Sequence, residues 1–112
     1  MKVNRISECW GVILRELRYS SQNLTTWSIY RPQRKTFTVR ANTNSVIVEG
    51  PSISAPRTIN YNEFECVARL YPAYAQHKLR IRQRMRNECG FNSSYIITLI
   101  HEFCEANTII DR

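Results

Sequence analysis

The stretch that decides the fold is residues 60–106, which read NYNEFECVARLYPAYAQHKLRIRQRMRNECGFNSSYIITLIHEFCEA. Asn60 and Asn62 each have a glutamate three residues further on. That spacing is typical of a helix start, where the asparagine side chain and the glutamate carboxylate each accept a hydrogen bond from the other's backbone amide. We therefore expect a helix that begins at one of the two asparagines. It should kink or restart at Pro72, because proline lacks the amide hydrogen and clashes with the preceding turn.

In the middle of this stretch, over residues 79–86, every second residue is arginine. As a strand, the segment would place its arginines on one face and its remaining side chains on the other. As a helix, it would pair Ile81 with Met85 and spread the arginines over three sides. We favour a helix that ends near Gly90, because glycine commonly follows a helix terminus.

The stretch ends in the most apolar run of the chain, residues 95–100. We expect a last helix from Tyr95 to about Ala106, capped by Asn92 or Ser93. A helix that is apolar on nearly every side lies at the centre of a protein or at a subunit interface. A homodimer through this C-terminal helix is therefore one expectation.

The N-terminal half predicts a helix followed by strands. Residues 6–19 repeat apolar side chains at steps of three and four, which indicates an amphipathic helix. Gly11 either weakens that helix by about 1 kcal/mol relative to alanine or permits a close approach to another element. Short β-branched and aromatic segments then alternate with polar turns, as in an antiparallel meander. The expected strands are Trp27–Tyr30, Phe37–Arg40 and Val46–Glu49, with Arg57–Ile59 as a candidate for a brief edge strand.

Together these elements predict an α+β fold. At 112 residues the chain has the length of one domain, residues 1–112. Its expected architecture is a three-stranded antiparallel meander flanked by an N-terminal helix and a C-terminal helical block.

Two segments of the C-terminal half carry a resemblance to known proteins: Ile59-Asn60-Tyr61-Asn62-Glu63-Phe64 and Asn92-Ser93-Ser94-Tyr95-Ile96-Ile97-Thr98-Leu99-Ile100. With these segments the chain resembles short bacterial proteins carried on mobile elements, the products of integron gene cassettes. The resemblance implies a compact bacterial α+β protein, and it is compatible with a dimer. It implies no site residue, because those proteins share no established activity.

The charge of the chain points to an anionic partner. Sixteen Lys and Arg against nine Asp and Glu give a net charge of +7, and all but Lys2, Lys35 and Lys78 of the basic residues are arginine. Arginine is weakly hydrated, and its planar fork suits phosphates and carboxylates. The composition therefore favours nucleic acid, an acidic protein or an anionic metabolite as partner.

The basic block is the feature from which we predict a function. Its cations could grip phosphates while a nearby tyrosine stacks on bases. We therefore predict a non-enzymatic binding protein for a polyanion, nucleic acid first. The alternative is a solvated face whose arginines pair with Glu63, Glu65 and Glu88. The candidate nucleic-acid-binding residues are Lys78, Arg80, Arg82, Arg84, Arg86 and Tyr74.

Two other function classes stay open. A metal-independent ribonuclease of toxin type could use His77 or Tyr74 for proton transfer, with arginines stabilising the phosphate charge. A small-molecule-binding protein could use an aromatic cleft between the sheet and the first helix. The candidate residues for that cleft are Trp10, Trp27 and Tyr30.

Neither a metal nor a cofactor is expected. The only aspartate is Asp111 and the glutamates are scattered, which disfavours a Mg²⁺ site. His101 and Cys104 share a helical face that Cys89 could approach, but the spacing follows no rule for zinc ligands.

The cysteines and the apolar runs set the expected location. Cys9, Cys66, Cys89 and Cys104 are widely separated and form no Cys-x-x-Cys pair. With no secretory signal visible, we expect them to be free, buried thiols in a cytoplasmic protein. The longest apolar run has six residues, whereas a bilayer needs about 20, so no membrane association is expected.

Overall fold

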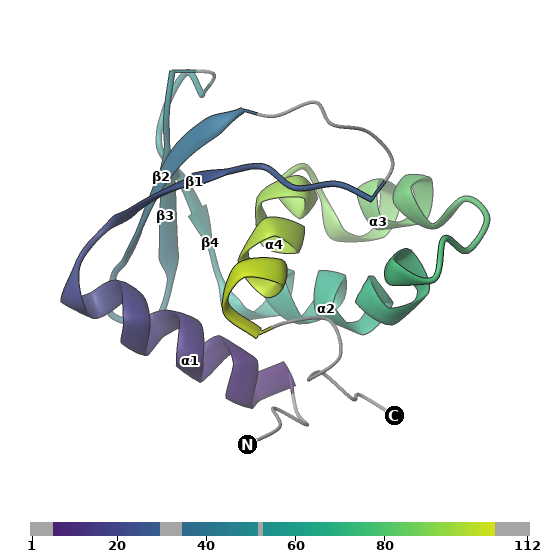
Figure 1. Cartoon of the computed structure of the whole chain (residues 1–112), viewed down its shortest axis with the longest axis horizontal. Helices are drawn as coiled ribbons and strands as arrows, with labels where there is room; N and C mark the ends of the chain where they lie inside the picture. The colour runs from purple at the N-terminus through teal and green to yellow at the C-terminus, as the bar shows by residue number, and fades with distance from the viewer. Residues whose placement is uncertain (1–5, 30–34, 52, 105–112) are drawn as a thin grey trace.

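The computed structural model describes residues 6–29, 35–51 and 53–104 (Figure 1). The chain forms an N-terminal helix, a four-stranded antiparallel sheet and then three helices, so the predicted α+β class is confirmed with one strand more than the expected meander. Figure 1 shows α4 between the sheet and α2. The elements are α1 (Ile6–Tyr19), β1 (Gln22–Thr25), β2 (Thr36–Ala41), β3 (Val46–Glu49), β4 (Arg57–Ile59), α2 (Tyr61–Ala75), α3 (Ile81–Cys89), α4 (Ser93–Leu99) and the π-helical turn η1 (Ile100–Cys104).

The sheet is a meander in the order β1-β2-β3-β4. Val39 of β2 lies opposite Val48 of β3, and both side chains are fully buried. Their sequence neighbours point to the other face, since side chains alternate along a strand. The short edge strand expected at Arg57–Ile59 is confirmed as β4, paired with β3.

The predicted first strand is wrong. Strand β1 is Gln22–Thr25, and the segment Trp27–Ile29 that was expected to pair leaves the sheet instead. Its amides find side-chain acceptors on the helices: Trp27 N–H donates to Thr98 Oγ1 at 3.0 Å, and Ile29 N–H donates to the Tyr74 hydroxyl at 3.1 Å. Because these bonds satisfy amides that a strand would use for its ladder, the segment is held by helices α4 and α2. Tyr30 and the turn residues 31–34 lie outside the described residues.

Helix α2 starts as expected and passes its proline. The Asn60 side chain accepts a hydrogen bond from Glu63 N–H at 2.9 Å, which confirms Asn60 as the N-cap. The helix neither ends nor restarts at Pro72; it continues to Ala75. Pro72 is one turn from that end, and its missing amide removes one hydrogen bond of the helix.

Helix α3 confirms the helical interpretation of the arginine block. Ile81, Met85 and Cys89 follow one another at steps of four and are buried, so the helix has one narrow apolar stripe. Gly90 ends it with φ +92°, a left-handed region that favours glycine.

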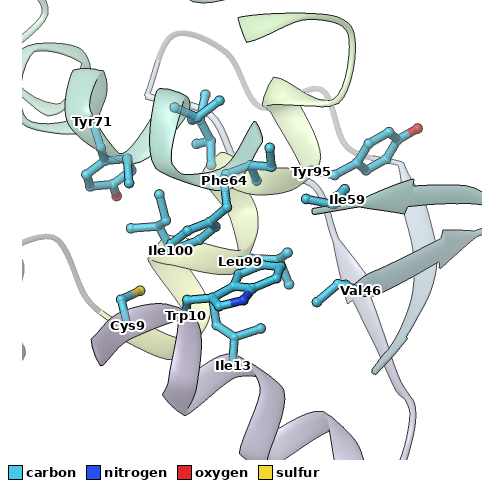
Figure 2. Close-up of a cluster of buried hydrophobic side chains, with 14 of the residues drawn as sticks. Cys9, Trp10, Ile13, Val46, Ile59, Phe64, Tyr71, Tyr95, Leu99 and Ile100 are labelled. Carbon is cyan, nitrogen blue, oxygen red and sulfur yellow. The ribbon is translucent and has the colours of Figure 1, made fainter. Parts of the chain in front are cut away.

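Helix α4 and η1 form the centre of the core. Ile96, Ile97, Leu99 and Ile100 are almost fully buried within one chain. Figure 2 shows Leu99 and Ile100 pointing toward Trp10 of α1 and Phe64 of α2. The central position that the sequence allowed is therefore the observed one. The dimer stays a prediction, and residues 93–104, the described part of this helix, leave no free apolar face for it.

The expectation of free cysteines is wrong. Cys9 bonds to Cys104 and Cys66 bonds to Cys89, with Cα–Cα distances of 5.8 and 5.6 Å. Both distances are typical of disulfides. Sequence spacing did not reveal the pairs because α1 meets η1, and α2 meets α3, only in the folded chain. In the described part of the chain, no helix is long and apolar enough to cross a membrane.

Candidate nucleic-acid interface

The turn between α2 and α3 is built by a helix-ending motif. His77 N–H donates to the Tyr74 carbonyl and Lys78 N–H to the Ala73 carbonyl, both at 3.0 Å. This bond pair is the Schellman motif, in which the residue after the C-cap adopts the left-handed conformation. His77 does so with φ 58°, and Arg80 follows with φ 62°. The turn is therefore fixed by backbone bonds, although neither residue is glycine.

The five cations of the block, Lys78, Arg80, Arg82, Arg84 and Arg86, are called the basic surface below. Lys78 and Arg80 lie on the turn, and both are exposed. Arg82 and Arg86 are four residues apart, so they share one flank of α3. On the other flank, Arg84 Nε lies 2.7 Å from Glu88 Oε2. The expected spread of the arginines around a helix is therefore observed.

An open pocket of about 350 Å³ lies where the turn meets α3. Three members of the basic surface line it, Lys78, Arg80 and Arg82, together with His77 and the exposed side chain of Leu79. The Arg82 guanidinium also donates to Ser93 Oγ at 3.0 Å, which holds it against the start of α4. The pocket is wide enough for a phosphate group, and its cations approach from both the turn and the helix.

Pairing with glutamates accounts for only part of the positive charge. Arg84 pairs with Glu88, but both side chains are at least half exposed, and such exposed pairs contribute about 0–1 kcal/mol. Lys78, Arg80 and Arg86 form no ion pair with any residue that the structure describes. A phosphate can therefore reach these three cations without displacing a carboxylate of residues 6–29, 35–51 or 53–104.

Tyr74 does not belong to the basic surface. Its side chain is 1% exposed, and its hydroxyl accepts from Ile29 N–H and donates to Ser28 Oγ at 3.4 Å. The ring therefore has no open face on which a base could stack. The same burial removes Tyr74 as a candidate for proton transfer in the ribonuclease alternative.

Trp10 and Trp27, two of the residues of the expected aromatic cleft, do not lie together. Trp10 is a core residue, with its ring 4.9 Å from that of Phe64. Trp27 lies elsewhere, stacked on His101 with ring centroids 3.8 Å apart and planes 3° apart. Tyr30 lies outside the described residues. Trp10 thus packs in the hydrophobic core. Trp27 packs against η1 and so holds the segment Trp27–Ile29 next to that turn.

No metal centre forms from the described residues. Among residues 6–29, 35–51 and 53–104, no three His, Cys, Asp or Glu side chains are close enough to hold an ion. The set of His101, Cys104 and Cys89 fails for a further reason, because each cysteine is bonded to a different cysteine partner.

Three features near the basic surface have no signal in the sequence. These are the left-handed His77, the exposed Leu79 and the disulfide that begins at Cys66. A glycine or asparagine at position 77 would have marked the turn, since these residues are the usual ones there. Histidine carries no such signal.

Comparison of the chain with protein-family models, with curated proteins and with solved structures finds no match. The resemblance to integron gene-cassette products therefore stays a prediction.

Proposed function

We propose that this chain is a non-enzymatic binding protein that holds nucleic acid through the basic surface. The observation that carries the proposal is the set of three exposed cations, Lys78, Arg80 and Arg86, without an ion pair in the described part of the chain. Arginine and lysine bind phosphate oxygens, and each contact releases a counterion from the nucleic acid.

The rigid turn supports binding more than it supports catalysis. Its backbone is fixed on the α2 side by the Schellman bonds, so Lys78 and Arg80 lose little backbone freedom when they meet a phosphate. Cleavage without a metal needs an acid and a base on the two sides of the phosphorus. Two groups were predicted for proton transfer, Tyr74 and His77. Tyr74 is buried, so of these two only His77 lies at the pocket.

Salt dependence gives the first test. Five phosphate contacts predict a slope of log K against log salt of about −4.5 on duplex DNA, since each contact contributes roughly −0.9. Fluorescence anisotropy with labelled duplex DNA, single-stranded DNA and RNA between about 50 and 200 mM salt measures the slope for each.

The matched variants make that test specific. Arg80→Gln/Arg86→Gln should reduce the steepness of the slope by about 2. Arg15→Gln/Arg40→Gln removes the same charge from exposed positions on α1 and β2 and should leave the slope nearly unchanged. Equal losses in the two double variants would show that net charge alone causes binding. Intact labelled RNA after incubation supports binding; RNA cleaved in a His77-dependent way contradicts the non-enzymatic proposal.

A further inference from the structure

The Cys66–Cys89 disulfide encloses the whole basic surface. Cys66 lies in α2 and Cys89 is the last residue of α3. The turn and all five cations are in the 22 residues between them, 67–88. The bond therefore joins the far end of the arginine helix directly to its neighbour.

Helix α3 has few other anchors. Of its nine residues only Ile81, Met85 and Cys89 are buried, and the bond from Arg82 to Ser93 is made near its beginning. After Cys89 come Gly90 and Phe91, whose side chain is 84% exposed and adds no packing. The disulfide and the fully buried side chain of Met85 thus attach the half-helix that carries Arg84 and Arg86.

The two disulfides differ in their access to solvent. Cys9 and Cys104 are 0% and 3% exposed, inside the hydrophobic core. Cys66 is only partly buried, at the edge of that core. Thiol–disulfide exchange requires direct attack on a sulfur, so the accessible bond reacts first.

We propose that Cys66–Cys89 is a redox latch for the basic surface, an inference that rests on the proposed function for its effect on binding. A dithiol reductant attacks one sulfur through its thiolate, and the S–S bond breaks to give a mixed disulfide. The second thiol of the reductant then displaces the remaining protein thiol. Two electrons pass to the chain, which ends with two thiols, while the reductant ends as a cyclic disulfide.

The latch couples binding to the compartment. With the bond closed, the arginines of α3 are held in place; with the bond open, they must be ordered when the polyanion binds. Disulfides persist in oxidising compartments and are rare in the cytosol. The proposal therefore favours an oxidising compartment for the binding-competent form, and the cytoplasmic location expected from the sequence stays a prediction.

The test follows the thiols of the oxidised full-length chain under graded dithiothreitol. Free thiols are alkylated and located by mass spectrometry, hydrogen exchange of residues 80–91 is measured, and anisotropy records binding of labelled duplex DNA. Cys66 and Cys89 should be alkylated before Cys9 and Cys104. At the reductant concentrations that release only Cys66 and Cys89, hydrogen exchange in α3 should rise. The affinity for duplex DNA should fall about tenfold, because one or two long side chains must then be ordered on binding.

The cysteine variants separate the latch from the proposed function. Cys66→Ser/Cys89→Ser should bind as weakly as the partly reduced chain, whereas Cys9→Ser/Cys104→Ser should keep the affinity of the oxidised chain. Simultaneous release of all four thiols, unchanged exchange in α3, or global unfolding of Cys66→Ser/Cys89→Ser would overturn the latch. If the oxidised chain binds no polyanion, the proposed function fails, while the order of thiol release and the exchange of α3 still decide whether the latch exists.

Discussion

Replacing Gly11 with alanine should stabilise the protein, whereas the same change at Gly50 should destabilise it. Gly11 is exposed in the middle of α1, and a Cβ built there meets nothing within 4 Å. Alanine is favoured over glycine inside a helix by about 0.5–1 kcal/mol, mainly because glycine loses more backbone freedom on folding. The free energy of unfolding of Gly11→Ala should therefore rise by about that amount.

At Gly50 the structure reverses the sign. A Cβ there would lie 3.1 Å from the Thr36 carbonyl oxygen and 3.2 Å from Phe37 Cα. Both atoms belong to the backbone of β2, which is paired with strands on its two sides and cannot rotate away. Overpacking of this kind costs about 1–3 kcal/mol, which exceeds the entropy gained by removing a glycine.

Thermal and urea unfolding of the two variants provide the assay. An unfolding entropy of about 2.1 cal/mol/K per residue converts 0.5–1 kcal/mol into about 2–4 °C for a chain of this length. The melting temperature of Gly11→Ala should rise by that amount, and that of Gly50→Ala should fall. A decrease for Gly11→Ala would mean that α1 has a close neighbour at this position, and an increase for Gly50→Ala would mean that β2 yields to the methyl group.

Two further predictions concern a buried hydroxyl and an alkaline transition. Thr98→Val should cost about 1–3 kcal/mol in urea unfolding, because the fully buried hydroxyl accepts from Trp27 N–H and that amide would lose its partner; exposed Thr58→Val is the control, and equal effects would refute the reasoning. Burial, and next the charge of Glu65, raise the pKa of Tyr61 above its ordinary value of 10.0. The unfolded chain therefore loses this proton first as pH rises above 10, so stability should fall there. In rapid unfolding measurements, Tyr61→Phe should reduce the decrease of stability with pH above 10. An unchanged dependence of stability on pH would mean that other groups cause the decrease.

The sequence determined the helices because their signals are local. The three- and four-residue steps of α1 placed Ile6–Tyr19 with the observed bounds. The glutamates three residues after Asn60 and Asn62 predicted that α2 starts at one of the two, and Gly90 predicted the end of α3 nearby. Each of these signals acts within one or two turns of chain, so it can be read without knowing the tertiary partners.

Tertiary structure alone decided the first strand, the cysteine pairs and the membership of the basic surface. Trp27 has strong strand propensity, but its amide is satisfied by Thr98, which is 71 residues away. Cys9 bonds to a cysteine 95 residues away. Tyr74 is buried away from the arginines that follow it in the sequence, and its hydroxyl accepts a hydrogen bond from Ile29 N–H. In each case the outcome depends on which distant group satisfies a hydrogen bond or reaches a sulfur atom, and the neighbouring residues in the sequence do not specify that group.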